Sequence, residues 1–474
     1  MKKILLFSFL LLIAARGFSQ QFSQYNTGTL YDSFENPSQR SFIPDSSKQF
    51  ASNFFVPNIN ASFFITGDIQ STLINRAFGA RYVDNNLVIG QGKYNQFNID
   101  AGNYDIMFKL FGSLKGNSEW GIFVATKMEG KGSFSDETIA ALNGPGAFPN
   151  SIYDNVFNDH EYYQIYNDIG VSYREQVTPK LALGVKLGML LGINYNKLDI
   201  NQSHISFDNV SNTETISLAG KYYKSQGPGN FDGRSFLPNT RSSGVQLSLG
   251  SSYKTDDHIT LQFNLKDLGF IHWYNNSTIA DFSGTELITG TTSTKRETNL
   301  VDGALAILKF NKGLASFTSS TNSKFELSAS KSYFIDDDKT IKYIPTLIAS
   351  KELLYSGFTG AFVNRFQYKN YNVSLTGTYD NLNLFNLGLQ FMIKSANGEF
   401  FIGSDKLTQS LSLLGASHNY ASYTNGSFIG ASFFLGFSLK FGQVIEHPLN
   451  ASRIPTGERG FLGRLYNRLF KTYW

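Results

Sequence analysis

The stretch LALGVKLGMLLGINYN, residues 181–196, alternates between apolar residues and residues that are mostly small or polar. Every second residue from Leu181 to Tyr195 is apolar, and seven of the other eight residues in the stretch are small or polar. A period of two places successive side chains on opposite faces of a β-strand and excludes a helix. Sixteen residues span about 50 Å at roughly 3.3 Å each, whereas a strand that crosses a bilayer needs only about 9–11 residues. The stretch therefore predicts a strand that is long enough to cross a membrane and protrude from it.

The same alternation recurs along most of the chain, for example in residues 259–265 and 428–441. Polar residues lie in mid-strand on the opposite face; they include Lys186, Asn194, Gln262, Asn264, Lys266 and Lys440. A barrel accommodates both faces, because the apolar face meets lipid and the polar face lines the lumen, and closure pairs every strand edge. A secreted soluble β-sandwich would explain any one of these strands, but it explains a dozen of them poorly.

Candidate strands occupy fifteen ranges: 59–66, 104–114, 119–130, 160–176, 180–196, 214–225, 240–254, 258–272, 323–333, 340–350, 355–366, 370–380, 384–394, 398–404 and 428–441. Bacterial single-chain barrels usually have an even number of strands, so we expect about fourteen. The predicted fold is all-β. It is a transmembrane antiparallel β-barrel with short helices in its loops and a C-terminal amphipathic helix.

The first 19 residues predict a secretory signal peptide. A basic start precedes an apolar run over residues 4–15, and the small residues Gly17 and Ser19 fit cleavage before Gln20. Beyond this segment no run of about 18 apolar residues predicts a transmembrane helix. The chain contains no cysteine, which excludes disulfides, a lipoprotein anchor and thiol catalysis. These features together predict a location in the outer membrane of a Gram-negative bacterium.

Charge and aromatic content agree with this location. Without the signal peptide the chain carries 38 Lys and Arg residues against 37 Asp and Glu residues. Such a balance indicates neither a nucleic-acid partner nor a strongly charged one. The 43 Phe residues are mostly isolated among polar or glycine neighbours, as expected for an apolar band in alternate positions that faces outer-membrane lipid.

The chain outside residues 57–444, the predicted barrel, forms two further segments. Residues 20–56 are polar and irregular, and we expect an N-terminal arm or a plug that enters the lumen. Residues 445–474 form a predicted periplasmic extension that ends in a basic amphipathic helix. That helix either packs beneath the barrel, docks on the membrane leaflet or binds a periplasmic or secretion-system protein.

Two long segments within the barrel range break the alternation. Residues 131–159 include a predicted short helix at about 136–142. Residues 274–322 are rich in Ser, Thr, Asn and Gly, with a helical island near 302–308. Long polar loops of this kind usually lie on the extracellular side of a barrel, and short turns on the periplasmic side.

No sequence motif indicates catalysis. No two of the six histidines have metal-ligand spacing, and the chain has no Gly-x-Ser-x-Gly elbow, phosphate loop or His-Glu-x-x-His motif. Residues 336–338 are three consecutive aspartates that could bind a cation. They lie between two predicted strands, which favours a solvated hairpin turn instead. We therefore predict no enzyme activity, no cofactor and no metal site.

Five motifs in order resemble a family of exported barrels of unknown function from Bacteroidota. The signal peptide ends in GFSQ, and Asn36-Pro37 resembles the Asn-Pro-Ala sequence that precedes the first strand in that family, with Ser38 in place of Ala. The paired strands around residues 180–192 (KLALGVKLGMLLG) match its most regular hairpin. Residues 266–273 (KDLGFIHW) resemble an Asp-x-Gly-x-x-x-Trp signature, and residues 400–407 (FFIGSDKL) a Ser-Asp-Asn-Leu motif with Lys406 in place of Asn. The resemblance implies no known activity; it marks as structural candidates Asn36, Pro37, Asp267, Gly269, Trp273 and Asp405.

Two wider resemblances lead to different functions. The overall plan is similar to fatty-acid-transporter-like barrels, which implies passage of hydrophobic solutes. The opening QFSQY resembles type IX secretion membrane proteins of the PorP/SprF family, which implies a scaffold for secretion or gliding machinery. Because a plain porin needs neither the arm nor the basic helix, we expect a non-enzymatic barrel that acts through partner proteins. The alternative is a passive transporter or channel for hydrophobic or small solutes, and both an open and a plugged lumen fit the sequence.

Overall fold

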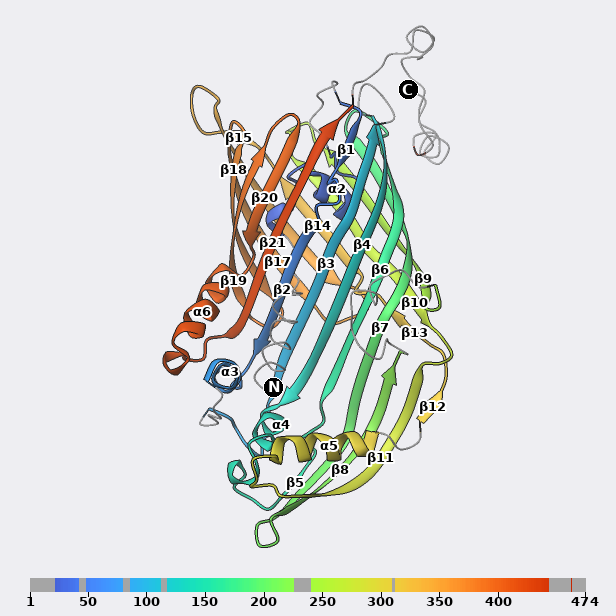
Figure 1. Ribbon diagram of the computed structural model, residues 1–474. Coiled ribbons are helices and arrows are strands. Elements are labelled where there is room, and N and C mark those ends of the chain that lie inside the picture. Colours follow the sequence, from blue (N-terminus) through green and yellow to red (C-terminus); the bar gives the residue numbers. More distant parts are fainter. Residues whose placement is uncertain are drawn as a thin grey trace.

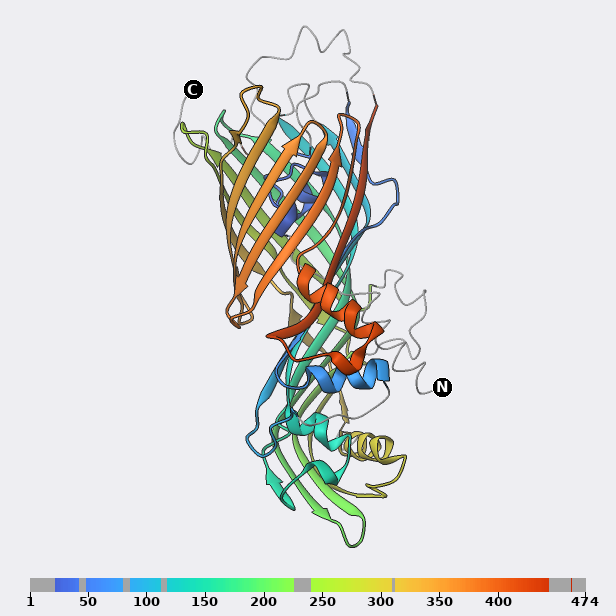
Figure 2. The same cartoon turned by 90° about the vertical axis from the view of Figure 1, so that its left-hand side faces the viewer.

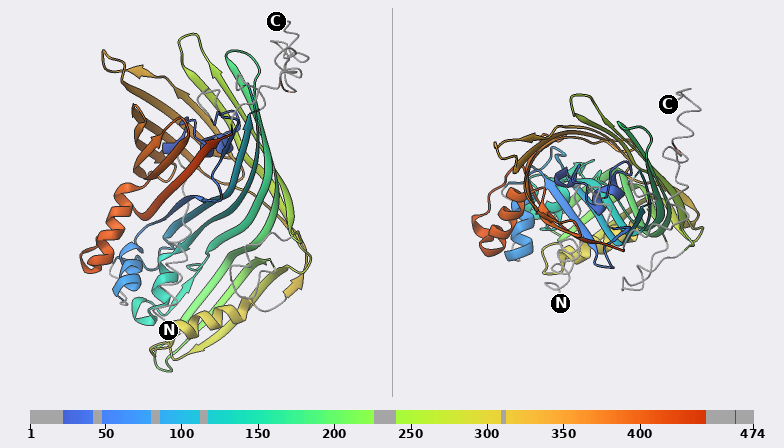
Figure 3. Two further views of the ribbon diagram at one scale, coloured as in Figure 1. Left: turned by 45° about the horizontal axis from the view of Figure 1, so that its top comes forward. Right: turned by 90° about the horizontal axis from the view of Figure 1, so that it is seen from above.

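The computed structural model describes residues 22–41, 48–79, 86–111, 117–225, 240–308, 312–442 and Leu462. Their strands form one antiparallel sheet that closes around a lumen (Figures 1 and 3). Among the described residues, sixteen strands have seven residues or more. They are β2 (Asn58–Thr66), β3 (Tyr94–Phe111), β4 (Ser118–Ser135), β6 (His160–Gln176), β7 (Leu181–Asp208), β8 (Thr213–Lys224), β9 (Ser243–Lys254), β10 (Thr260–Trp273), β11 (Thr278–Thr289), β14 (Lys324–Ser330), β16 (Ile341–Glu352), β17 (Phe358–Tyr368), β18 (Tyr371–Asp380), β19 (Phe385–Lys394), β20 (Gly398–Ser404) and β21 (Phe428–Phe441).

Shorter elements accompany these strands. The short strands are β1 (Phe50–Ser52), β5 (Ile152–Asp154), β12 (Lys312–Leu314), β13 (Phe317–Ser320) and β15 (Tyr333–Phe334). The helices are η1 (Phe22–Gln24), α2 (Leu30–Glu35), α3 (Gln70–Ile74), η2 (Asn75–Gly79), α4 (Asp136–Ala141), η3 (Pro145–Ala147), α5 (Arg296–Leu308), α6 (Leu407–His418) and η5 (Tyr420–Ser422). None of the helices in the described part of the chain has the length and apolar character needed to span a bilayer.

The sheet closes between its first and last long strands. β2 pairs antiparallel with β3 on one side and with β21 on the other, where Ile59 lies opposite Leu435 and Thr66 opposite Phe428. β1 continues the position of β2 and pairs with the same two neighbours. Closure therefore leaves no free strand edge along this seam, as a sheet in a membrane requires.

The closed ring contains fourteen long strands, and β8 and β11 pair beside β7 outside it. The sheet as a whole therefore contains sixteen long strands, two more than expected. All fifteen ranges identified from the alternation overlap one of them. The sixteenth, β11, lies in residues 274–322, which we expected to be loop, and α5 in the same segment is longer than the expected helical island. Phe282 and Ile288 of β11 are buried, but Gly284 and Glu286 interrupt the apolar stripe between them, so the alternation is weak in the sequence.

Strand β7 pairs with a different neighbour along each half of its length on the same side, and its second half extends the sheet beyond the barrel. It pairs with β9 over residues 181–191 and with β8 over residues 196–208. β8 pairs with β11, and α4 and α5 lie beside these strands to form a projecting lobe with its own buried apolar cluster, which includes Ile205, Phe282 and Ile307 (Figure 2). Helix α4 begins after Ser135, whose side chain accepts a hydrogen bond from the backbone N–H of Thr138, at the position expected from the sequence.

The two faces of the wall follow the sequence alternation. Outward apolar side chains that are at least 40% exposed include Trp120, Ile122, Val171, Leu187, Met189, Val245, Leu347, Phe362, Leu375, Phe391 and Phe433. The mid-strand polar residues Lys186, Gln262, Asn264 and Lys440 are buried. The stripe of β7 departs from expectation beyond Met189, where Leu191, Ile193 and Tyr195 are buried; the pairing with β6 shifts register in the same stretch, between Gly192 and Asn194.

The two ends of the barrel differ in their connections. At the turn end, tight connections at residues 177–180, 255–259, 369–370 and 395–397 join consecutive strands. At the loop end, longer segments carry α3, α4, α5 and α6. The three aspartates at 336–338 lie in a turn at the turn end, where Asp336 accepts hydrogen bonds from the backbone N–H groups of Thr340 and Ile341.

Two predictions lie outside the described residues. One is the signal peptide, and the other is the C-terminal amphipathic helix, apart from Leu462. The backbone N–H of Leu462 donates to the Glu175 carboxylate near the turn end at 3.0 Å.

Candidate functional site

Residues 22–41, which we call the plug, lie inside the barrel, where α2 is visible within the ring of strands (Figure 3). Thr29 caps α2 by accepting a hydrogen bond from the backbone N–H of Asp32 at 3.0 Å. The Asp32 carboxylate in turn accepts from the backbone N–H groups of Thr27 and Gly28. Apolar side chains of α2, Leu30 and Phe34, are fully buried against the wall. The plug thus has local structure of its own and a packed contact with the lumen.

The first half of the plug is anchored to four consecutive strands. The Ser23 hydroxyl donates to the Asp405 carboxylate, which follows β20, at 2.8 Å, and it lies 3.0 Å from the Thr376 hydroxyl on β18. Cationic side chains bind the plug backbone: Arg365 of β17 donates to the carbonyl of Asn26 at 2.8 Å, and Lys394 of β19 donates to that of Thr27 at 3.0 Å. The Glu399 carboxylate of β20 accepts from the backbone N–H of Leu30 at 2.5 Å. Charged donors and acceptors make such bonds stronger than neutral ones.

The second half of the plug meets a buried cluster of charges. Glu35 forms an ion pair with Lys266 of β10 and accepts a hydrogen bond from the Tyr104 hydroxyl at 2.8 Å. The next residue on β10, Asp267, has a positive φ of 54° where the pairing with β9 shifts register. Its carboxylate binds Lys127 of β4 at 2.6 Å and Lys186 of β7 at 3.1 Å. A buried cation needs such a partner, so Asp267 holds together charges from three strands beside the plug.

Burial and neighbouring charges set the pKa values of the two plug carboxyls. Burial raises the pKa of Asp32 to about 7, although its hydrogen bonds from Gly28 and Thr27 favour the charged form. Burial also acts to raise the pKa of Glu35, but the lysine side chains around it, Lys266 first, outweigh burial and lower that pKa below its usual value. Glu35 is therefore a stable anion in the ion pair, whereas Asp32 is partly protonated near neutral pH.

The Asn36-Pro37 turn fits against glycines of the wall. The Asn36 side-chain oxygen accepts from the backbone N–H and hydroxyl of Ser38, which closes the turn. A Cβ on Gly184 of β7 would lie 2.1 Å from the Pro37 carbonyl oxygen, and a Cβ on Gly250 of β9 would lie 2.4 Å from the Asn36 side-chain oxygen. Only glycine permits this close approach of the plug to the wall.

Replacing Gly184 with Ala is expected to displace the turn from the wall. Overpacking of a well-packed contact costs about 1–3 kcal/mol, so the plug would detach more often. Limited digestion by trypsin after Arg40 should become several-fold faster, because 1 kcal/mol changes the ratio of detached to attached plug about fivefold. Gly146→Ala is the matched control, because a Cβ there meets nothing within 4 Å. Equal cleavage of both variants would contradict the fit.

The remaining sequence candidates shape the wall. Trp273 is fully buried at the end of β10, where its Nε1–H donates to the Ser319 hydroxyl at 2.8 Å and its ring packs against Tyr195. A Cβ on Gly269 would lie 2.5 Å from the carbonyl oxygen of Val245 on β9. The structure therefore places Asn36, Pro37, Asp267 and Asp405 at or beside the contact of plug and wall, and Gly269 and Trp273 within the wall itself.

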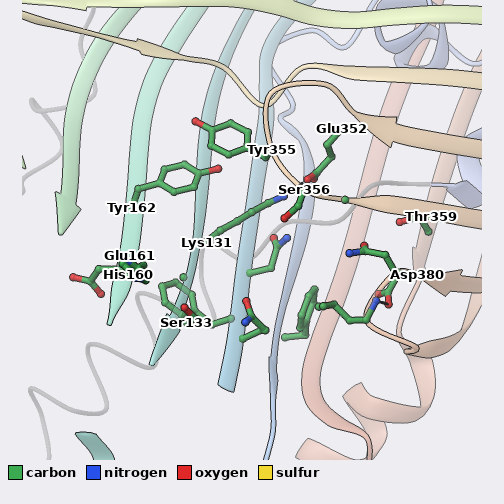
Figure 4. Close-up of a pocket in the computed structure, with 18 of the residues that line it drawn as sticks. Lys131, Ser133, His160, Glu161, Tyr162, Glu352, Tyr355, Ser356, Thr359 and Asp380 are labelled. Atoms are coloured by element: carbon green, nitrogen blue, oxygen red, sulfur yellow. Dashed lines mark hydrogen bonds and ion pairs between the residues drawn. The ribbon is translucent and has the colours of Figure 1, made fainter. Parts of the chain in front are cut away.

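Two adjoining cavities lead from the loop end toward the plug. The larger, which we call the mouth cavity, has a volume of about 290 Å³ and lies between the ends of β3, β4 and β6 on one side and β16, β17 and β18 on the other (Figure 4). The second has a volume of about 100 Å³ and shares several lining residues with the first: Phe64, Asn98, Glu352, Thr359 and Asp380. Phe22, Asp405 and Lys406 also line this inner cavity, so the first described residue of the plug borders it.

Most of the residues that line the mouth cavity are polar or charged. Lys131 forms an ion pair with Glu352, which also accepts a hydrogen bond from the Asn322 amide at 3.1 Å. The rings of Tyr162 and Tyr355 stack with centroids 4.8 Å apart and an interplanar angle of 10°. The sequence did not identify this site, because its residues are spread from residue 64 to residue 382 and share no motif. Polar side chains at the loop ends of otherwise regular strands were the available signal. Within the described residues, no group of three or more His, Asp or Glu side chains is placed to hold a metal ion.

Comparison with known proteins gives a family and distant barrel matches. Residues 44–405 match a family model described as a family of unknown function, DUF5723. No curated protein sequence matches the chain. Among solved structures, the toluene transporter TodX of P. putida is similar with 8% sequence identity and a TM-score of 0.36, over 86% of this chain and 93% of that one. A FadL homologue of Pseudomonas aeruginosa is similar with 10% identity and a TM-score of 0.39, over 90% and 96%. At these TM-scores no function is transferred from either structure.

Proposed function

We propose that this chain, which belongs to the DUF5723 family, is an outer-membrane barrel that admits a small solute past a movable plug in its lumen. The description of the family names no activity. Of the two functions that the sequence suggested, we thus prefer a transporter or channel to a scaffold that acts through partner proteins. The scaffold expectation rested on the N-terminal arm and on residues 445–474. The described part of the arm, residues 22–41, lies in the lumen, and of residues 445–474 only Leu462 is described. No contact in the described part of the chain favours a protein partner.

The outer surface supports membrane insertion. Exposed apolar side chains surround the wall, and a soluble protein of this kind would present a large apolar patch to water. The signal peptide that the sequence predicts is a further argument for export. By the rule that short turns face the periplasm, the turn end faces inward and the loop end, with the projecting lobe, faces the cell surface.

The observation that carries the proposal is the sequence of cavities above the plug. A solute that enters from the loop end meets the mouth cavity of about 290 Å³, then the inner cavity of about 100 Å³ bordered by Phe22. The two cavities adjoin, so they form a path that stops at the plug. Passage beyond this point requires the plug to move, and its anchors are hydrogen bonds and ion pairs, which can break and re-form. The polar and charged residues along both cavities favour a small polar solute over the hydrophobic one that the sequence plan implied.

Liposome swelling tests the proposal. Purified full-length protein is reconstituted, and swelling is followed in isosmotic arabinose, sucrose and raffinose. We expect swelling that is faster for the smaller sugars and faster still for Glu35→Gln, which removes the ion pair with Lys266. The matched control is Asp281→Asn, which removes a solvent-exposed pair with Lys221 in the lobe. If neither wild type nor Glu35→Gln swells in any sugar, the barrel is not a path for solutes.

A further inference from the structure

The chemistry of the mouth cavity narrows the class of solute. Uncharged polar side chains from both sides of the lumen line it: Gln96, Asn98, Ser133, Ser350, Ser356, Thr359 and Asn381. Amides and hydroxyls of this kind both donate and accept hydrogen bonds. Among the described residues that line it, three have purely apolar side chains, namely Phe64, Phe97 and Leu382. A hydrocarbon would leave most of these polar groups without water or a partner, which costs free energy.

The charges of the cavity disfavour an anion. Two lysines and four carboxylates line it. Lys131 is paired with Glu352, and Lys197 is paired with Asp199 at 2.8 Å. The other two carboxylates, Glu161 and Asp380, have no ion-pair partner among the described residues, so the net field of the lining is negative. A phosphate or carboxylate ligand would meet repulsion and find no free cation.

Aromatic rings provide a flat apolar surface within this polar lining. Tyr162 on β6 and Tyr355 in the connection from β16 to β17 stack on one another from opposite sides of the lumen (Figure 4). Both rings line the cavity, so each has surface that is not covered by the other. The combination of ring faces with hydroxyls, amides and carboxylates suits a molecule that has C–H faces and many hydroxyl groups.

The size of the cavity agrees with this class of molecule. A volume of about 290 Å³ equals that of about ten water molecules in the liquid. One or two sugar rings occupy a similar space. We propose that the mouth cavity is a binding site for a neutral, polyhydroxylated solute, a mono- or disaccharide. This inference rests on the proposed function, because it takes the mouth cavity as the first site that an entering solute meets.

Calorimetric titration of the purified full-length protein tests the inference, in a detergent without a sugar headgroup. The probes are glucose, maltose, cellobiose and trehalose, with glucose 6-phosphate as the anionic probe, ethanolamine as the cationic probe and toluene as the apolar probe. At least one neutral sugar should bind with a Kd of about 1 mM or lower. Tyr355→Ala should weaken that binding about tenfold, the size expected for one aromatic contact. Tyr355→Phe, which keeps the ring, should retain binding to within about threefold.

Tyr343→Ala is the matched control, because Tyr343 stacks on Phe366 on the wall and is not part of the cavity. Its binding should equal that of the wild type. The inference is overturned if no neutral sugar binds, if Tyr355→Ala binds as tightly as the wild type, or if only a charged or apolar probe binds. Binding without liposome swelling would contradict the proposed function but support the sugar site. Swelling without sugar binding would contradict the sugar site but support the proposed function.

Discussion

Deletion of residues 22–41 is expected to turn a barrel that opens rarely into one that conducts continuously. The plug is held by bonds to charged groups on β10, β17, β19 and β20, and each such bond contributes about 1.5–3 kcal/mol. Displacement of the plug that breaks one or two of these bonds costs a few kcal/mol, and a state at that height above the dominant one is populated at about 0.1–10%. Removing the plug should therefore raise the mean current per barrel by about 10- to 1,000-fold in planar bilayers.

Two controls make this result interpretable. The deleted protein should still run as a folded barrel on unheated SDS gels, because the closure of β2 with β3 and β21 does not involve residues 22–41. Glu35→Gln in the full-length chain removes one anchor of the plug, so its current should lie between that of the wild type and that of the deletion variant. A folded deletion variant that conducts no more than the wild type would mean that another part of the chain blocks the lumen.

Replacement of Asp267 with Asn is expected to produce the largest loss of stability among single substitutions in the lumen. Asn retains the shape of Asp and tolerates the left-handed backbone at this position, where φ is 54°. The substitution removes the nearest counter-charge of Lys127 and Lys186, and Lys186 is fully buried. Leaving a buried charge without its partner costs about 3–5 kcal/mol. Urea unfolding followed by tryptophan fluorescence in lipid vesicles measures this change in the free energy of unfolding.

The control for this prediction is Asp281→Asn. The pair of Asp281 with Lys221 has side chains 74% and 55% exposed, and such surface pairs contribute about 0–1 kcal/mol. A double variant, Asp267→Asn with Lys127→Met, should recover part of the loss, because it removes one of the stranded cations. Similar stabilities for Asp267→Asn and Asp281→Asn would show that the cluster is hydrated or re-pairs, for example through Asp168, which lies 3.7 Å from Lys127.

Local pattern made the wall predictable. A period of two is a property of neighbouring residues, so strands such as β7 and β21 were visible in the sequence with both faces assigned. β11 was missed for the same reason, since Gly284 and Glu286 interrupt its stripe and its partners β8 and α5 supply the burial. The sequence predicted only the first half of β7, because the second half pairs with a different strand, β8 instead of β9.

The candidate site depended on contacts between distant residues. Asn36, Pro37 and Asp405 were marked through a family resemblance, and the sequence could not show that Asp405 meets Ser23, 382 positions away. Tyr162 and Tyr355 carried no signal at all, because stacking across a lumen follows from how the barrel closes. Mid-strand charges such as Lys186 and Lys266 were identified as facing the lumen, but their partners on the plug and on other strands were not.

A reversible lock on the plug tests the central claim, that solutes pass only when the plug moves. The chain has no cysteine, so the double variant Ser23→Cys and Thr376→Cys carries only the introduced pair, whose parent hydroxyl oxygens lie 3.0 Å apart. Liposome swelling in arabinose is measured after oxidation and again after reduction. The account predicts no swelling in the oxidised state and recovery to the rate of the reduced single variants after dithiothreitol. Equal swelling in the two states, with the disulfide confirmed by mass spectrometry, would contradict it.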